Sequence, residues 1–129
     1  LTDISDASKL FRWYRKIGQA CYGEGSNKVS YLKDLFPNYL VSLLDDETKQ
    51  YISNALLKDA LDDHELIKTI QVYLQSNSND TEASKKMFLH RNSLQYRIDK
   101  FIEWTGIDIK NFEGAVTTYL ILKMIGKNN

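Results

Sequence analysis

Apolar side chains recur every three to four residues along most of the chain, which is the spacing of one face of an α-helix. Short polar breaks rich in glycine, asparagine, serine or aspartate separate these apolar stretches. No stretch has a convincing strand pattern, and no internal repeat is visible. The pattern therefore predicts an all-α fold.

The first half of the chain predicts several helices. Its opening apolar stripe consists of Ala7, Leu10, Phe11, Tyr14, Ile17 and Cys21. A glycine-containing break at 23–27 is followed by a short helix that we expect to end at Pro37, and by a second short helix over about 38–44. Three consecutive acids at 45–47 suit the positive end of a helix dipole. They predict a helix whose apolar side chains are Tyr51, Ile52, Ala55 and Leu56.

The second half has clearer helix boundaries. Asp62 and Glu65 have the spacing of a capping box, with aspartate in place of serine or threonine, and they predict the start of an amphipathic helix. The polar segment 76–80 should end that helix and cap the next one, and Gly106 suits the left-handed position after a helix. The last helix, about 111–125, is apolar nearly all round, so we expect it to be buried in the domain or against a partner.

The segment 80–104 has the pattern of a helix-turn-helix. A short helix over about 81–88 and a turn at Leu89 and His90 precede a longer helix over about 92–104. Ala83 and Ser84 are small enough to let the two helices cross closely. The apolar contacts at the elbow and along the inner face of the longer helix would come from Met87, Leu89, Leu94, Ile98, Phe101 and Ile102.

The outer face of the longer helix is rich in hydrogen-bond donors of the kind that read base edges or hold phosphates. These residues are Arg91, Asn92, Ser93, Gln95, Tyr96, Arg97 and Lys100. The alternative is an ordinary solvated face, with Tyr96 packed on lysine or arginine stems and Arg97 paired with Glu82 or Glu103. His90, in the turn, fits a structural hydrogen bond better than contact with a base.

Composition and charge limit the functions that the chain can have. The 129 residues, 43% of them apolar, suffice for one compact domain or two very small ones. The net charge is zero, yet residues 82–100 hold five basic and two acidic side chains. A local basic patch matters more than the total, because salt screens charges beyond about 8–10 Å. No apolar run is long enough for a transmembrane helix.

No enzyme constellation, metal site or cofactor motif stands out. The acids and histidine at 62–65 point in different directions from a helix start, and Cys21 lies on an apolar stripe, as a buried thiol does. The glycines at 23–28 lack the spacing of a phosphate loop. Basic and aromatic residues at 12–16 fit a solvated face better than a surface that stacks on single strands. We therefore expect no enzyme activity, no metal and no cofactor.

Residues 90–98 read His-Arg-Asn-Ser-Leu-Gln-Tyr-Arg-Ile. They resemble the C-terminal helix-turn-helix signature of PucR/CdaR-type bacterial regulators, whose pattern is close to H-R-N-T-L-x-Y-R-L. These proteins are the regulators of purine catabolism and of sugar diacids. The resemblance extends over about 66–122, including the Trp-Thr-Gly turn at 104–106. Ser93 replaces the usual threonine and Ile98 the usual leucine, and both keep the side-chain chemistry. Residues 1–61 resemble only loosely the end of the family's middle, GGDEF-like region, without a cyclase motif.

The resemblance implies a cytoplasmic transcriptional regulator that binds double-stranded DNA through a helix-turn-helix domain at 62–129, with the recognition helix 92–104 in the major groove. It implies a homodimer in the full-length protein and an effector small molecule bound by a further N-terminal region. We expect such a region because the chain begins at Leu1 and not at methionine. Five residues, of which the motif carries all but Gln95, would lie near bases or flanking phosphates: Arg91, Asn92, Ser93, Gln95 and Tyr96. Backbone contacts are expected from Arg97, also in the motif, and, on helix geometry, from Thr81, Lys85, Lys86 and Lys100.

The alternative hypothesis is an all-α protein-interaction or dimerisation module that does not bind DNA. Its docking surfaces would be the last helix and the stripe from Ala7 to Cys21. A DNA-binding domain predicts salt-dependent binding that weakens when Arg91 or Arg97 is changed, whereas a protein-docking module responds to apolar substitutions instead.

Overall fold

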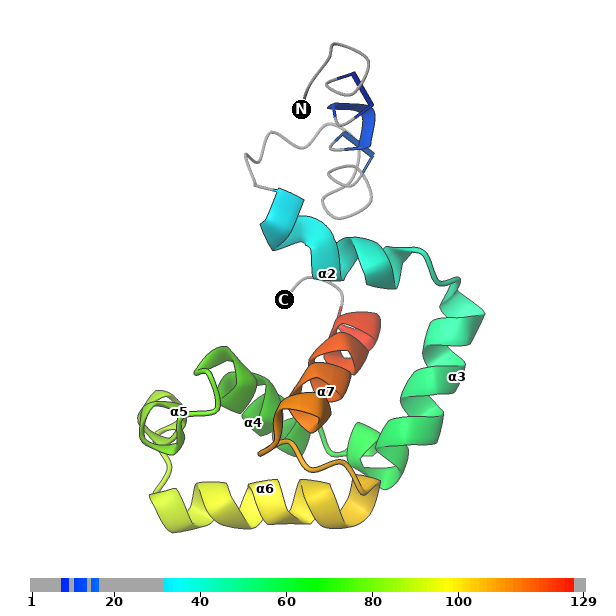
Figure 1. Ribbon diagram of the computed structural model, residues 1–129. Helices are drawn as coiled ribbons and strands as arrows, with labels where there is room; N and C mark the ends of the chain where they lie inside the picture. The colour runs from blue at the N-terminus through cyan, green and yellow to red at the C-terminus, as the bar shows by residue number, and fades with distance from the viewer. Residues whose placement is uncertain (1–7, 10, 14, 17–31, 127–129) are drawn as a thin grey trace. The chain divides into compact units, whose positions relative to one another are not determined.

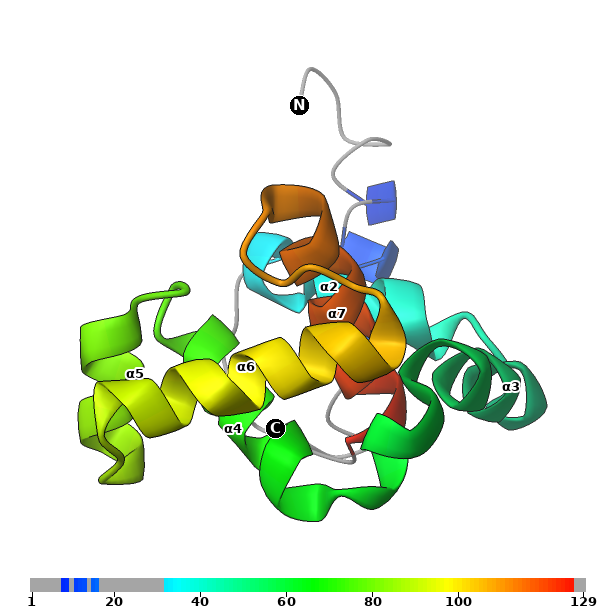
Figure 2. The ribbon, with the colours of Figure 1, turned by 90° about the horizontal axis from the view of Figure 1, so that it is seen from below.

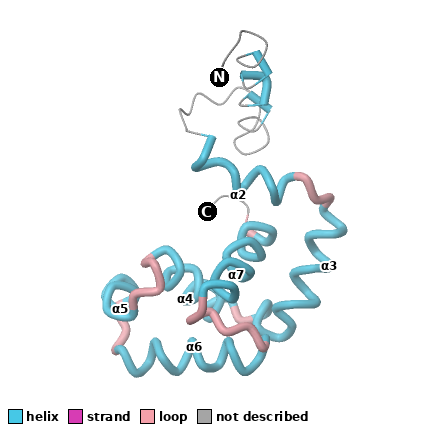
Figure 3. The backbone as a smooth tube through the Cα atoms, viewed as in Figure 1, coloured by secondary structure: helices cyan, strands magenta, loops and turns pink. Residues whose placement is uncertain are grey.

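The computed structural model describes residues 8–9, 11–13, 15–16 and 32–126. All regular elements in this part of the chain are helices, which confirms the all-α prediction (Figure 3). The chain divides into two compact units, residues 1–45 and 46–129. None of the described helices is long and apolar enough to cross a membrane.

Between residues 32 and 45 the structure has one helix where we expected two. Helix α2 runs from Leu32–Ser42 without interruption and holds Pro37 inside it, so the predicted stop at this proline is wrong. Leu35 and Tyr39, one helical turn apart, are both buried, which indicates that burial of this face outweighs the hydrogen bond that proline removes. The ring of Trp13 meets that of Tyr39 edge to face, with centroids 5.8 Å apart.

The opening apolar stripe falls largely outside the described residues. Phe11, one of its members, is 63% exposed, so its ring is not part of a buried face. The other five positions lie outside the described residues: Ala7, Leu10, Tyr14, Ile17 and Cys21.

The second unit is built of five α-helices and one short 3-10 helix (Figure 1). In chain order they are α3 (Asp46–Leu57), η1 (Lys58–Asp62), α4 (His64–Gln75), α5 (Asp80–Met87), α6 (Arg91–Thr105) and α7 (Phe112–Ile125). In Figure 1, α6 runs along the lower edge of this unit. Seen from below in Figure 2, α6 lies in front of α4 and α7. The long side of α6 that faces the viewer in Figure 2 therefore has none of the other described helices over it.

A single apolar cluster joins these elements. The predicted inner stripe of the longer helix is confirmed, because Leu94, Ile98 and Phe101 are almost completely buried and Ile102 packs against the cluster. Every other element of the unit contributes to the same core, through Leu57, Ala60, Leu66, Ile70, Tyr73, Ala83 and Ile121, and the turn before α7 adds Ile109.

Helix α3 buries a different face from the one expected, and α7 is less buried within the domain than its all-round apolar pattern suggested. In α3 the buried residues are Ser53 and Leu57, whereas Tyr51 is 74% exposed. Ser53 tolerates burial because its hydroxyl donates to the carbonyl oxygen of Lys49 at 2.8 Å. In α7 only Thr118 and Ile121 are buried and Phe112 is 82% exposed, so the domain itself covers one side of this helix.

Side-chain caps define the helix starts. Asn79 accepts from the amide of Glu82 at 2.9 Å and begins α5, as the polar break at 76–80 predicts. The capping prediction for Asp62 is wrong by one residue, because Asp63 accepts from the amide of Leu66 at 3.0 Å and begins α4. Asp62 instead ends η1, a short helix that the apolar period did not indicate. Gly106 adopts the predicted left-handed conformation after α6, with φ of 75°.

We predict that Gly114→Ala destabilises the fold by about 1–3 kcal/mol, as overpacking does. A Cβ atom on Gly114 would collide with the backbone carbonyl of Asp108, which cannot move aside as a side chain can. In an exposed helix the same substitution would stabilise, since alanine is the better helix former. Chemical denaturation followed by circular dichroism measures the change. Thr117→Ala, at an exposed site on the same helix, is the control, and a neutral Gly114→Ala would contradict the close approach.

Candidate nucleic-acid interface

Helices α5 and α6 form the predicted helix-turn-helix. Ala83 is completely buried and Ser84 almost so, which lets α5 pack closely on α6. The hydroxyl of Ser84 donates to the carbonyl oxygen of Thr81 at 3.0 Å, so its burial leaves no unpaired polar group. The predicted boundaries are correct to within one residue, since α5 covers Asp80–Met87 and α6 covers Arg91–Thr105.

The turn between the two helices contains a strained residue. Phe88 ends α5 in the left-handed conformation, with φ of 54°, and its side chain is 95% exposed. The amide of Leu89 then donates back to the carbonyl oxygen of Ser84 at 2.9 Å, which requires that left-handed residue. Glycine adopts this conformation without cost, whereas phenylalanine does not.

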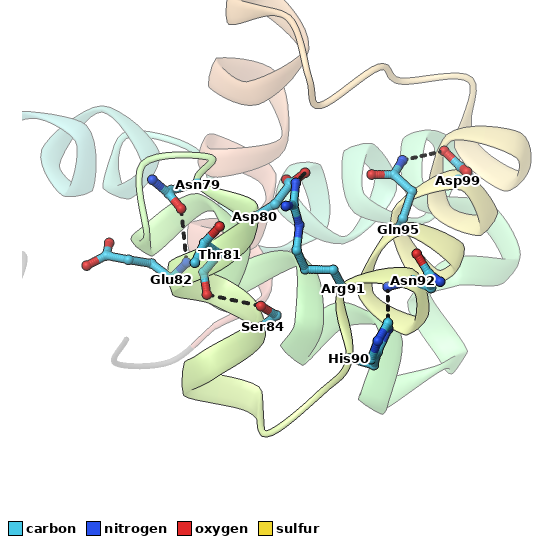
Figure 4. A network of polar contacts seen from close by, with 10 residues as sticks. All are labelled: Asn79, Asp80, Thr81, Glu82, Ser84, His90, Arg91, Asn92, Gln95 and Asp99. Carbon is cyan, nitrogen blue, oxygen red and sulfur yellow. Dashed lines mark hydrogen bonds and ion pairs between the residues drawn. The ribbon is translucent and has the colours of Figure 1, made fainter.

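His90 caps the second helix. Its Nδ1 atom accepts from the amide of Asn92 at 3.2 Å, so the imidazole has the structural role that the sequence favoured (Figure 4). Asn92 and Arg91 follow directly in the first turn of α6, which carries no acidic residue. Within α6 itself, the positive end of the helix dipole therefore carries only uncharged and basic side chains.

Two basic side chains of α6 turn toward α4 instead of solvent. Arg97 donates through Nη1 to the hydroxyl of Thr69 at 2.8 Å, a partner other than the acids, Glu82 and Glu103, that were considered as the alternative. Lys100 donates to Oδ2 of Asp63 at 3.2 Å and lies 4.5 Å from the centre of the Trp104 ring. Both residues were expected at the DNA backbone, and the structure instead gives each a partner within the domain.

Asp63 thus serves both α4 and α6. One carboxylate oxygen caps α4 and the other accepts from Lys100. The amide of Leu66 and then Lys100 hold the pKa of the Asp63 carboxyl below its usual value. Burial raises the pKa of the Tyr73 hydroxyl on α4, and the negative charge of Asp80 raises it further. The contact between Asp63 and Lys100 therefore joins the start of α4 to α6.

The remaining predicted residues lie on the outside of the motif. Tyr96 is 69% exposed, so the alternative in which it packs on lysine or arginine stems is not favoured. Gln95 donates to Oδ1 of Asp99 at 2.9 Å, along the same helix. The side chains of the other predicted contacts are all exposed: Thr81, Lys85, Lys86, Arg91, Asn92 and Ser93.

Sequence reasoning missed one ion pair at this surface. Nη2 of Arg91 lies 3.9 Å from Oδ2 of Asp80, the first residue of α5 (Figure 4). It also missed Thr69 and Asp63 as partners of α6, because these contacts join residues 28 and 37 positions apart. No local spacing signals such pairs.

The comparisons with known proteins agree with this geometry. Residues 66–124 match the family described as the PucR C-terminal helix-turn-helix domain. The chain is 61% identical over 57 residues to the uncharacterized protein YxkF of Bacillus subtilis, covering 44% of the chain and 19% of that relative. It is 29% identical over 127 residues to the purine catabolism regulatory protein of Bacillus subtilis, which is 96% of the chain and 24% of the relative.

A third relative is the carbohydrate diacid regulator of Escherichia coli, 29% identical over 92 residues, or 70% of the chain and 24% of the relative. The chain therefore spans about a fifth to a quarter of the length of these relatives. No solved structure matches it significantly.

We predict that Asp63→Asn flattens the pH dependence of stability at acid pH. The lowered pKa means that the Asp63 charge stabilises the fold above the unfolded value of about 3.9, and that this contribution is lost as pH falls through the lower folded value. Asparagine still caps α4 but carries no charge. Urea midpoints at about pH 6 and pH 2.5 measure the difference. Asp59→Asn in η1 is the control. An equal loss of stability on acidification in wild type and in Asp63→Asn would contradict the stabilising role of the Asp63 charge.

We predict that Phe88→Gly is more stable than Phe88→Ala by about 1 kcal/mol. Both variants remove the same exposed ring, and only glycine removes the left-handed strain. The comparison therefore isolates the backbone term. Guanidinium denaturation of the two variants gives the value, and equal stabilities would show that the turn is unstrained.

With the motif geometry and these relatives together, residues 66–124 are assigned to the C-terminal helix-turn-helix domain of PucR-type regulators, as the motif at 90–98 predicts.

Proposed function

We propose that this chain binds duplex DNA, with the N-terminal half of α6 in the major groove, as the DNA-binding part of a cytoplasmic transcriptional regulator. One observation carries the proposal. The first two turns of α6 expose Asn92, Ser93 and Tyr96 with no acid among them, while the other side of the same helix is anchored on α4. Within α6, acids appear only further along, at Asp99 and Glu103, where they would repel phosphates.

Individual roles follow from the directions of the side chains. Asn92, Ser93 and Tyr96 are assigned to base edges or the phosphates beside them, because they share the exposed face of α6. Gln95 adjoins this face but is held by Asp99. Thr81, Lys85 and Lys86 on α5 are assigned to the DNA backbone.

Arg97 and Lys100 act from behind the interface. Their partners are Thr69 of α4 and Asp63, the N-terminal cap of α4, so the two basic side chains set the position of the recognition helix. This revises their expected role as phosphate contacts, although their charge still contributes to the positive potential around α6.

Homodimerisation and effector binding belong to the proposal for the whole regulator, of which this chain is about a fifth to a quarter by the length of its relatives. A single helix-turn-helix makes few phosphate contacts, and two linked copies gain affinity through effective concentration.

The protein-interaction alternative has one observation in its favour. Phe112, Val116 and Tyr119 place exposed apolar surface on α7, which the domain covers only on its other side. That surface suits a protein contact, and it is compatible with DNA binding by α5 and α6.

We predict that the chain binds mixed-sequence duplex DNA with an affinity that falls steeply with salt. Lys85→Ala/Lys86→Ala should reduce the log–log salt slope by about 2, because each lost phosphate contact removes about one released counterion. Asn92→Ala/Tyr96→Ala should leave that slope nearly unchanged and reduce discrimination between sequences. Fluorescence anisotropy at several salt concentrations, with labelled duplexes, measures both.

The control is Lys68→Ala/Lys123→Ala, which removes the same charge from α4 and α7 and should leave the slope unchanged. A chain fused to a dimerising coiled coil is titrated in parallel, so that weak binding by one module is still detected. If neither form binds duplex DNA at about 50 mM salt while remaining helical, the DNA proposal is wrong and a protein partner is favoured.

A further inference from the structure

An acidic residue lies at the edge of the proposed DNA surface, beside its first arginine. Asp80 is the first residue of α5 and Arg91 the first residue of α6, and their charged groups approach to 3.9 Å. The side chains are 37% and 67% exposed, so the pair is open to a ligand. Figure 4 shows Arg91 reaching from the start of α6 toward Asp80.

Helix stability accounts for only one member of this pair. An aspartate at the N-terminus of α5 is favoured by the dipole of that helix. Arg91, however, occupies the first position of α6, where the dipole disfavours a cation. Exposed ion pairs contribute little to stability. The arginine at this position therefore needs another explanation, and its place at the reading end of α6 supplies one.

The carboxylate changes what Arg91 can bind well. A phosphate approaching Arg91 would also approach Asp80 and be repelled by it. Guanine presents two uncharged acceptors, O6 and N7, to a planar guanidinium that donates through two N–H groups. The Asp80 carboxylate lies 3.9 Å from Nη2 and is not hydrogen-bonded to it, so the five N–H donors of the arginine stay available for the base. The attraction of the nearby carboxylate favours conformations of Arg91 that point toward Asp80, so the side chain loses less entropy when it binds a base there.

We propose that Asp80 is a positioning residue that holds Arg91 for the recognition of one guanine and weakens its attraction to phosphates. The inference rests on the proposed function and deepens it. Arg91 becomes the residue that specifies a base, and Asp80 determines how strictly it does so.

The test is selection from a random-sequence duplex library by wild type, Asp80→Asn, Arg91→Ala and Glu82→Gln. Glu82 is the matched control, because it is an acid in the same turn of α5 that points away from Arg91 (Figure 4). Wild type should select guanine at one position of its site. Arg91→Ala should lose that preference, and Asp80→Asn should weaken it by about tenfold, a large share of what one bidentate contact provides.

Affinity for a mixed-sequence duplex gives the second readout. Asp80→Asn should bind this duplex more tightly, with a salt slope steeper by about one, because Arg91 becomes free for a phosphate. Glu82→Gln should keep the guanine preference of wild type. Far-ultraviolet circular dichroism establishes that each variant remains folded.

The outcomes distinguish the positioning role of Asp80 from DNA binding by the chain. Salt-dependent binding by wild type with an unchanged guanine preference in Asp80→Asn overturns the positioning role and leaves the proposed function standing. An equal loss of the guanine preference in Glu82→Gln also overturns the positioning role, since removing any negative charge from α5 would then have the same effect. No duplex binding by wild type or by its dimerised fusion overturns the proposed function itself.

Discussion

The rotation of α6 about its own axis is the constraint on which the proposed interface depends. Leu94, Ile98 and Phe101 are almost completely buried. Turning the helix would therefore expose their apolar surface to water and leave cavities in the core. Arg97 and Lys100 hold the flank beside this stripe through Thr69 of α4 and Asp63, the N-terminal cap of α4. With one face buried and one flank bonded, Asn92 and Tyr96 have only the outer side left to occupy.

The same constraint explains why similar residues on one helix take different roles. Arg91 and Arg97 are six positions apart, which places them on different sides of α6. Arg97 lies on the flank next to α4 and becomes part of the scaffold, whereas Arg91 lies next to α5 and stays accessible beside Asp80. Sequence composition treats both as basic residues on a recognition helix. Their surroundings make one a support and the other a candidate contact.

The features that the sequence could predict depend on local or short-range physics. The inner stripe of α6, the cap at Asn79, the left-handed Gly106 and the turn at His90 each follow from helical period or backbone chemistry. The features it could not predict depend on distant neighbours. Helix α2 continues through Pro37 because Leu35 and Tyr39, which flank the proline in the sequence, are buried. In α3, Ser53 is buried in place of the expected apolar stripe. The partners of Arg97 and Lys100 are equally remote in sequence.

A chain with no net charge can still present a surface suited to DNA, because the placement of charges matters more than their sum. In α6 the acids Asp99 and Glu103 follow the exposed polar residues and do not lie among them. Phosphates are therefore attracted to the N-terminal end of the helix and repelled further along it. This gradient favours an approach in which the start of α6 enters the groove first and its C-terminal half stays outside. Asp80 applies the same principle at the scale of one side chain, since it lowers the general attraction of Arg91 for phosphates and leaves its hydrogen-bonding geometry available for a base.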